Sequence, residues 1–301
     1  MDVLVTGSRG FIGSALLPAL TESGHRPIRA MRAETVPRGV DAIAWDPERG
    51  TVDVPALEGI GAVVHLAGAG IGDRRWTAAR KQLILESRTR GTRALAVALA
   101  SLQRRPSAFV SSSAVGYYGS HPGDAILTED SPPGDDFLAK VCVEWEAATA
   151  PAVEAGVRVV KVRQGIVLGR DGGMLGRLLL PFRLGLGGRI GSGGQWMSWI
   201  AIDDVVAAIL HAVDTETLAG AANFTAPTPV RNSEFASSLG KAMHRPTAIP
   251  TPLAPLRAVY GRELVDDMLL AGQRALPNAL ESSGYVFRHA TLDEALRAIL
   301  G

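Results

Sequence analysis

The sequence has few of the features that would place it outside ordinary globular proteins. It contains a single cysteine, Cys142, which excludes an internal disulfide and predicts a reducing compartment. No segment approaches the roughly 20 consecutive apolar residues of a membrane span. The opening segment Met1–Thr6 lacks a basic region and a cleavage site, so we expect no signal peptide. These absences predict a soluble cytoplasmic protein.

An excess of charge of either sign is also missing. The chain carries 31 basic and 30 acidic side chains, a net charge of +1, which indicates neither a nucleic acid nor an anionic membrane as partner. The six histidines show no metal-ligand spacing with each other or with Cys142, so we expect no metal site. A nucleophile elbow and a Walker A motif are absent as well, which leaves a small molecule as the expected partner.

Short apolar runs alternate with helical patterns over the first 165 residues. Strands are predicted at residues 3–6, 27–31, 42–45, 62–66, 108–112 and 157–162, and helices at residues 11–24, 77–102 and 137–155. This alternation predicts an α/β protein with a doubly wound parallel sheet, the Rossmann fold.

The pattern changes after residue 168. Ten glycines fall within residues 169–194, which indicates a mobile, partly helical insertion. A helix over 203–213, with Asp203 as its N-cap, returns to the sheet, and the final helix begins with a capping box at Thr291. We expect a Rossmann domain over 1–168, joined again by 201–225. Residues 169–200 and 226–301 would form a smaller, discontinuous C-terminal lobe for substrate.

A glycine-rich turn follows the first strand directly. In the spacing GxxGxxG, Gly7 permits the tight turn, Gly10 lets the backbone approach a pyrophosphate, and Gly13 allows close packing of helix on strand. The free N–H groups of the helix N-terminus favour phosphate. The sequence therefore predicts a dinucleotide site whose residues are Gly7, Ser8, Arg9, Gly10, Phe11, Ile12 and Gly13.

The end of the second strand indicates which dinucleotide binds. An acidic residue there would bind the ribose 2′-hydroxyl, whereas arginine accepts a 2′-phosphate. The strand ends at Arg32, with no acid before Glu34, and Arg9 lies within the glycine turn. Two guanidinium groups suited to bidentate phosphate binding favour NADP(H) over NAD. The alternative is that both arginines are solvated surface residues.

Several longer motifs resemble the extended short-chain dehydrogenase/reductase superfamily. They are the glycine turn, His65–Gly68 and Ser111–Gly119. Further stretches resemble its "epimerase family" branch, sometimes labelled nucleoside-diphosphate-sugar epimerase or SulA-type, which carries a C-terminal domain of unknown function. These stretches are Arg75–Thr77, Ser87-Arg88, Leu179–Gly188 and Gly272–Pro277.

The resemblance implies roles for individual residues. Leu66 and Ala67, with Gly68 in the same motif, would lie against the adenosine half of the cofactor. Arg88 would approach the cofactor from the long helix, or form an ion pair on its surface, and Val167 would border the nicotinamide. The long helix corresponds to a dimer interface in the family, so its charged face indicates either a homodimer contact or a solvated surface.

Typical members use a serine, a tyrosine and a lysine, the last two spaced YxxxK on one helix. Ser113 matches the serine, and Lys140 is the lysine candidate, with a ribose-binding or solvated role as alternatives. Four residues before it stands Asp136, and a carboxylate of pKa about 4 cannot replace a phenol of pKa about 10.

Two hypotheses follow from the missing tyrosine. In one, Tyr117 or Tyr118 supplies the phenol, and the protein is an oxidoreductase or epimerase acting on a small carbonyl or hydroxyl substrate, including a nucleotide sugar. In the other, the protein is a redox-inactive NADP(H)-binding sensor or regulator. Trp196, Met197 and Trp199 are expected either to wall the substrate pocket or to pack the core of the small lobe.

Overall fold

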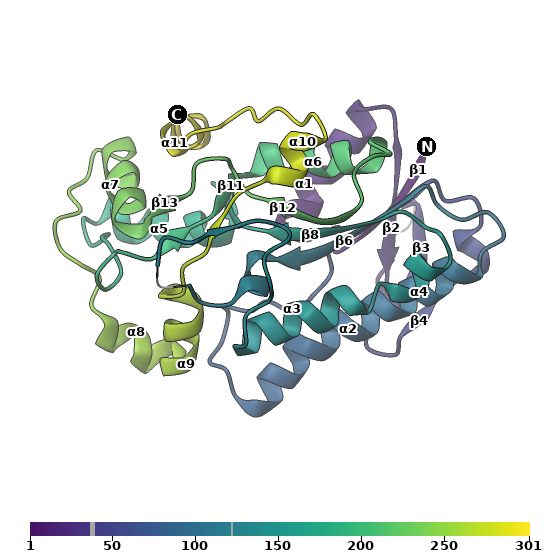
Figure 1. The fold of residues 1–301 in the computed structure, drawn as a ribbon, viewed down its shortest axis with the longest axis horizontal. Coiled ribbons are helices and arrows are strands. Elements are labelled where there is room, and N and C mark those ends of the chain that lie inside the picture. Colours follow the sequence, from purple (N-terminus) through teal and green to yellow (C-terminus); the bar gives the residue numbers. More distant parts are fainter. Residues whose placement is uncertain (37–39, 122) are drawn as a thin grey trace.

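The computed structural model describes residues 1–36, 40–121 and 123–301. Within these ranges, eight strands form one sheet in the order β12-β8-β6-β5-β1-β2-β3-β4 (Figure 1). Neighbouring strands are parallel except β4, which pairs antiparallel with β3. The strands are β1 (Asp2–Thr6), β2 (Arg26–Met31), β3 (Ala42–Asp46), β4 (Thr51–Val52), β5 (Ala62–His65), β6 (Ala108–Ala114), β8 (Val159–Gln164) and β12 (Gly220–Phe224).

Helices cover both faces of the sheet, as Figure 1 shows. One face carries α1 (Phe11–Glu22) and α6 (Ile202–Asp214). The other carries α2 (Ala78–Ser101), α3 (Phe137–Ala147) and α4 (Ala150–Glu154). A parallel sheet with crossover helices on both sides confirms the predicted doubly wound fold.

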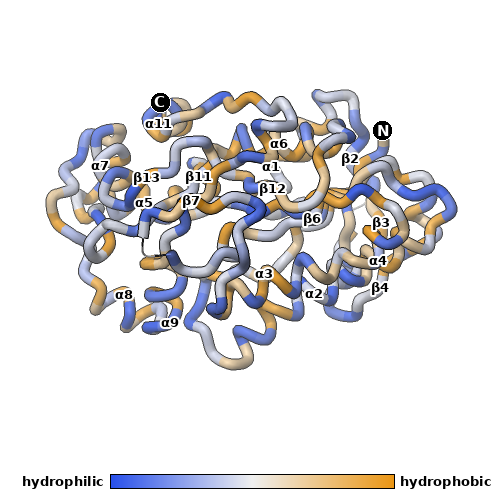
Figure 2. The backbone as a smooth tube through the Cα atoms, in the orientation of Figure 1, coloured by the Kyte–Doolittle hydropathy of each residue, from blue (hydrophilic) through white to orange (hydrophobic). Residues whose placement is uncertain are grey.

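The sheet is buried on both faces because its strands consist of continuous apolar runs. In β1, Val3 and Val5 pack toward Leu16 of α1, while Leu4 between them packs toward Leu99 of α2. All five side chains are fully buried. Figure 2 shows the hydrophobic positions concentrated along the central strands. The two cores hold the carboxyl ends of the strands in fixed positions.

A smaller lobe lies beyond one end of the sheet. It contains α5 (Gly173–Arg183), α7 (Asn232–Ala242), α8 (Leu253–Tyr260), α9 (Arg262–Leu264), a π-helix (Val265–Leu269) and α11 (Leu292–Leu300), whereas α10 (Asn278–Ser282) packs on β12 of the main sheet. Short strand pairs complete it: β9 (Ile166–Gly169) with β11 (Trp199–Ala201), β10 (Trp196–Met197) with β13 (Val230–Arg231), and β7 (Ile126–Leu127) with β14 (Arg274–Ala275). Its core includes Trp199, Phe235 and Leu296.

Short 3₁₀ turns mark the loops that follow the strands. They are Ala33–Thr35 after β2, Pro55–Leu57 after β4 and Val115–Tyr118 after β6. In the described part of the chain, no helix has the length and apolar character needed to cross a membrane.

Three local features differ from or refine the sequence prediction. The helix predicted over 137–155 is divided into α3 and α4, because Pro151 lacks the N–H that would continue the first helix. Helix α6 begins at Ile202 with Ala201 as N-cap, so Asp203 lies in the first turn instead of capping it. The capping box at Thr291 is confirmed, with Glu294 as its second member.

Candidate functional site: a cavity at the carboxyl ends of the strands

A cavity of ≈ 570 Å³ lies where β1, β5, β6 and β8 end and the smaller lobe begins. In a doubly wound sheet, ligands bind at the carboxyl ends of the strands, where the strand order reverses. The reversal here is between β1 and β5, because the chain leaves β1 for β2 on one side and continues to β5 on the other. The predicted residues that line the cavity are Gly7, Gly10, Phe11, Ile12, Gly13, Leu66, Gly68, Arg88, Ser113 and Val167.

The glycine turn has the geometry that a dinucleotide requires. Gly7 has φ +65°, in the left-handed region that glycine adopts without strain. A Cβ on Gly13 would lie 2.3 Å from the carbonyl oxygen of Gly7, so a side chain there would force the turn and helix α1 apart. Gly10 is the N-cap of α1 and offers no capping side chain, which leaves the N–H groups of the helix N-terminus free for phosphate. The turn therefore fits a dinucleotide pyrophosphate.

A buried hydrogen-bond chain fixes the loop after β5, and the sequence prediction missed it. The hydroxyl of Thr6 accepts hydrogen bonds from the backbone N–H groups of Leu66 and Ala67, at 3.1 and 3.2 Å. The ring of His65 bonds Thr6 at 2.7 Å and Thr92 at 2.9 Å. Complete burial lowers the pKa of His65 to about 3, so its ring is neutral. These bonds place Leu66 in the cavity wall.

The two arginines of the 2′-phosphate prediction lie outside the cavity wall, at the end of β2. Arg9 donates to the carbonyl of Thr35 at 3.0 Å, and Thr35 in turn donates to the carbonyl of Arg32. Arg32 pairs with Glu48, whose side chain is 73% exposed. An exposed ion pair of this kind is weak, so both guanidinium groups remain accessible to an anion at this point.

Arg88 supports the loop that crosses the cavity. Its guanidinium is buried and donates to the carbonyls of Ala69 and Ile84, at 3.0 and 3.1 Å. Burial lowers its pKa to about 10, and among the described residues no carboxylate pairs with it. The plane of Trp145 lies 4.9 Å away, a cation–π contact. Arg88 therefore contributes a buried positive charge to the cavity wall, in place of the predicted alternative of a surface ion pair.

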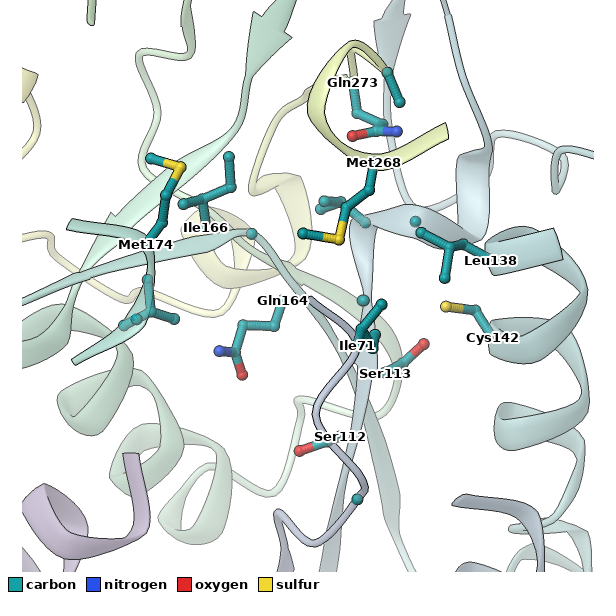
Figure 3. A pocket seen from close by; sticks show the side chains of 18 of the residues that line it. Ile71, Ser112, Ser113, Leu138, Cys142, Gln164, Ile166, Met174, Met268 and Gln273 are labelled. Carbon is teal, nitrogen blue, oxygen red and sulfur yellow. The ribbon is translucent and has the colours of Figure 1, made fainter. Parts of the chain in front are cut away.

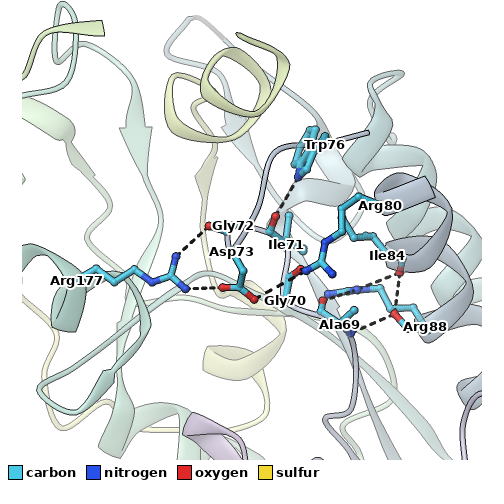
Figure 4. A network of polar contacts seen from close by, with 11 residues as sticks. Ala69, Gly70, Ile71, Gly72, Asp73, Trp76, Arg80, Ile84, Arg88 and Arg177 are labelled. Carbon is cyan, nitrogen blue, oxygen red and sulfur yellow. Dashed lines mark hydrogen bonds and ion pairs between the residues drawn. The ribbon is translucent and has the colours of Figure 1, made fainter. Parts of the chain in front are cut away.

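The same loop is tied to the smaller lobe. Arg177 of α5 donates to the carbonyl of Gly72 at 3.0 Å and to Asp73 at 2.5 Å (Figure 4). From α2, Arg80 donates to the carbonyl of Gly70. Because Arg177 and Arg80 bind from opposite sides, the loop over residues 69–76 forms a strap between the two parts of the molecule, and Ile71 within it lines the cavity.

The helix that was expected to carry the YxxxK pair turns a different face to the cavity. Leu138 and Cys142, four residues apart on α3, line the cavity together with Val141. Asp136 is the N-cap of this helix, and its carboxylate accepts from the N–H groups of Ala139 and Ser120 at 2.9 and 3.0 Å. Lys140 is exposed and lies outside the cavity wall. The assignment of Lys140 as the active-site lysine is therefore corrected by the phase of the helix.

Position 142 carries a thiol where an ammonium group would be needed. Cys142 is buried, and burial raises its pKa to about 12, so the thiol is neutral. Leu138, one helical turn earlier, is aliphatic. The two positions of α3 that face the cavity in YxxxK spacing thus hold neither a phenol nor a cation.

The predicted phenols of Tyr117 and Tyr118 lie outside the cavity wall. Tyr118 is fully buried, and its hydroxyl donates to Asn223 at 2.7 Å and accepts from Arg163 at 3.2 Å. Burial raises its pKa to about 12. Tyr117 lies against Arg163, with the guanidinium carbon 3.5 Å from the ring centroid. Both tyrosines are bound to Arg163 instead of facing the predicted partner Ser113 across a shared site, so the clustering of serine, tyrosine and lysine is corrected.

Ser113 lines the cavity, but its hydroxyl is directed into the protein. It donates to Glu146 at 2.8 Å. Glu146 forms a bidentate ion pair with Arg163, at 2.9 and 3.1 Å, and both side chains are buried. Neither Glu146 nor Arg163 was predicted. The available signal was that Glu146 lies four residues after Cys142, on the same face of one helix.

The remaining wall comes from the smaller lobe and from the end of β8. Figure 3 shows Gln164, Met174, Met268 and Gln273 around the same space as Ser113. Trp196 and Met197 line the cavity, which is one of the two predicted alternatives. Trp199 packs in the core of the lobe, which is the other, and Met197 also belongs to that core. The predicted residues Ser8 and Ala67 lie beside the cavity wall without forming it.

Phe11 joins the glycine turn to the smaller lobe. A Cβ on Gly169 or Gly172 would lie 2.5 or 2.6 Å from the ring of Phe11. Gly173, with φ +65°, begins α5 against the same ring. Because these three glycines have no side chains, the ring of Phe11, the first residue of α1, can pack against the start of α5.

Comparison with known proteins agrees with this architecture. Residues 3–223 match the family model described as the NAD dependent epimerase/dehydratase family, and residues 251–299 match a domain of unknown function, DUF1731. Epimerase family protein MT2273 of Mycobacterium tuberculosis is 44% identical over 294 residues, covering 98% of this chain and 96% of its own. Human epimerase family protein SDR39U1 is 40% identical over 304 residues, covering both chains completely.

Solved structures give the same result. The crystal structure of human SDR39U1 (isoform 2) with NADPH superposes with a TM-score of 0.91 at 39% identity, covering 100% of this chain and 99% of that chain. The nucleoside-diphosphate sugar epimerase of Corynebacterium glutamicum has a TM-score of 0.80 at 36% identity, covering 100% of this chain and 58% of that one. The resemblance seen in the motifs is confirmed: the chain belongs to the NAD dependent epimerase/dehydratase family, in the branch that carries the DUF1731 domain.

Proposed function

We propose that the protein binds NADP(H) along the turn Gly7–Gly13 and holds a small molecule beside the nicotinamide half, without the tyrosine–lysine proton transfer of typical family members. This is the second of the two hypotheses from the sequence, an NADP(H)-binding sensor or regulator. A bound nicotinamide cofactor supplies hydride chemistry, and the chain supplies the binding groups.

The phosphorylated cofactor is favoured by the groups at the end of β2. Arg9 and Arg32 both contact the segment Ala33–Thr35, and β2 ends without an acidic residue before Glu34. Glu48 is the counter-ion of Arg32 and is largely exposed, so a 2′-phosphate can take its place at little cost. The human relative described with NADPH supports the same choice.

The observation that carries the proposal is the pair Leu138 and Cys142. In this spacing on the helix, typical members place the phenol that exchanges a proton with the substrate and the ammonium group that lowers the pKa of that phenol. A leucine side chain holds no proton, and the Cys142 thiol is neutral and buried. The hydroxyl of Ser113, the third member, already donates a hydrogen bond to Glu146.

Two measurements test the proposal. Calorimetric titration with NADPH, NADP+ and NADH is expected to show strong preference for the phosphorylated forms. Incubation of the NADP+-loaded and NAD+-loaded protein with UDP-glucose and UDP-galactose, followed by NMR, is expected to show no epimerisation. Preference for NADH would overturn the cofactor assignment, and epimerisation would overturn the loss of proton transfer.

One observation favours a second candidate, an NADP(H)-dependent reductase of carbonyl compounds. Asp267 of the π-helix lines the cavity, and burial together with the neighbouring charge of Asp136 raises its pKa. A carboxyl group that stays protonated to higher pH is a proton donor. If this candidate is correct, NADPH oxidation with a panel of carbonyl compounds declines as pH rises through the carboxyl pKa. Asp267→Asn then abolishes it, and the exposed Asp135→Asn leaves it unchanged.

A further inference from the structure

The half of the cavity away from the glycine turn has apolar walls. The strap contributes Ile71, α3 contributes Leu138, β9 contributes Ile166, and the smaller lobe contributes Met174 and Met268 (Figure 3). Methionine side chains are unbranched and polarisable, and they adapt to apolar ligands of different shape. Because these side chains come from five separate segments, the apolar surface encloses the ligand space instead of forming one wall.

Ionisable groups are few around this space. Among the described residues that line the cavity, Arg88, Cys142 and Asp267 are the ionisable ones. Arg88 is directed beneath the strap to backbone carbonyls, and Cys142 is neutral. A diphosphate requires cationic or multiple N–H donors, and Asp267 adds a carboxyl group that opposes an anion.

Two arginines beside Trp196, outside the wall, are already engaged. Arg231 and Arg274 lie against the ring of Trp196, 4.3 and 4.5 Å from its centroid. Arg231 forms an ion pair with Asp124, and Arg274 donates to the backbone carbonyl of Asp124 at 3.2 Å. This cluster at the edge of the cavity therefore includes its own counter-ion.

Neutral amides supply the polarity that remains. Gln273 donates its amide N–H to the carbonyl of Gly119 at 2.7 Å, and Gln195 donates to the carbonyl of Leu269 at 3.2 Å. Gln164, at the end of β8, points into the cavity in Figure 3 and makes no side-chain hydrogen bond to another described residue. A partly buried amide without a partner in the protein is suited to a hydrogen bond from or to a ligand.

We infer that this half of the cavity binds an uncharged, largely apolar small molecule with one carbonyl or hydroxyl group for Gln164, and that it does not bind a nucleoside-diphosphate sugar. The inference rests on the proposed function, because it assigns the glycine-turn half of the same cavity to NADP(H). It departs from the substrate class that the name of the Corynebacterium glutamicum relative states.

The test uses 2-acetonaphthone as an apolar ketone, naphthalene as the same ring without the carbonyl, and UDP-glucose as the charged alternative. Each is titrated calorimetrically into the full-length protein saturated with NADP+, an oxidised cofactor that cannot reduce the ketone. The ketone is expected to bind at least tenfold more tightly than UDP-glucose. Tighter binding of UDP-glucose, or no binding of the ketone, would overturn the inference.

Two variants locate the binding. Gln164→Leu is expected to weaken the binding of the ketone about fivefold, the equivalent of one hydrogen bond, while the affinity for naphthalene does not change. Met268→Gln is expected to weaken the binding of both the ketone and naphthalene about tenfold, because an apolar contact becomes polar. Met243→Gln, at the end of α7 and outside the cavity, is the matched control. Equal effects of Met268→Gln and Met243→Gln would overturn the placement.

The experiment separates failure of this inference from failure of the proposed function. NADP+ is titrated first into every variant, and the ketone is titrated into the protein with and without cofactor. Absence of NADP+ binding would refute the proposed function alone, since ketone binding to the cofactor-free protein still tests the apolar site. NADP+ binding without ketone binding would refute the inference alone.

Discussion

The buried ion pair between Glu146 and Arg163 makes a quantitative prediction about stability. The two side chains are 8% and 5% exposed and are joined by a bidentate contact at 2.9 and 3.1 Å. Glu146→Gln keeps the shape of the side chain but removes its charge, which leaves the guanidinium buried without a counter-charge. Removing one partner of such a pair costs about 3–5 kcal/mol.

For a chain of 301 residues, this cost corresponds to a fall in Tm of roughly 5–8 °C, from an unfolding entropy of about 2.1 cal/mol/K per residue. Glu144→Gln is the matched control, because Glu144 lies on the same helix two residues earlier and is exposed. Differential scanning calorimetry of the three proteins at pH 7 measures the difference directly.

The reasoning also predicts how the loss can be reversed. Replacing both partners, as in Glu146→Leu with Arg163→Met, removes the unpaired charge and is expected to cost less than Glu146→Gln alone. A Tm for Glu146→Gln within 1 °C of Glu144→Gln would refute the assignment of a desolvated pair. It would mean that the ring of Tyr117 alone compensates the buried guanidinium.

Four further results are expected. The pKa of His65 is about 3 in the folded protein and about 6.5 in the unfolded chain, so only the unfolded chain binds this proton as pH falls from 6.5 to 4.5. The free energy of unfolding therefore drops by roughly 1.4 kcal/mol per pH unit over this range. His65→Gln should flatten that slope in urea titrations. In calorimetry, Arg32→Ala should weaken the binding of NADPH at least tenfold and leave the affinity for NADH unchanged. Gly13→Ala should abolish NADPH binding while the far-UV circular dichroism is retained, because its Cβ would meet the Gly7 carbonyl at 2.3 Å. Arg177→Ala should speed NADPH release about two- to fivefold in stopped-flow fluorescence, since its pair with Asp73 is exposed.

The sequence predicted the sheet and the glycine-rich turn because both depend on local patterns. Apolar runs locate the strands to within one or two residues for most of the sheet, and the spacing of Gly7, Gly10 and Gly13 reports a backbone conformation that few other residues adopt. Helix α2 begins at Ala78, one residue after the predicted start, and Thr77 is its N-cap, whose side chain accepts from the N–H of Arg80.

Which side chains face the cavity from α3 was beyond the reach of local patterns. Whether Lys140 or Cys142 faces the cavity depends on the phase of α3, and a shift of two residues turns a helix by about 200°. The role of Tyr118 depends on Asn223, which is 105 residues away in the chain, and Arg163 is 45 residues away. Such contacts follow from the order of strands in the sheet, which periodicity alone does not give.

The contact of Phe11 with the glycines at the start of α5 would couple the two proposed ligands. The residue that opens helix α1, and so borders the phosphate site, is also in contact with the segment that places Met174 in the apolar wall. In the proposed function, a dinucleotide that binds at the turn would therefore also set the position of that wall for the second molecule. Linkage then requires reciprocity: whatever the cofactor adds to the affinity of the second ligand, that ligand returns to the cofactor.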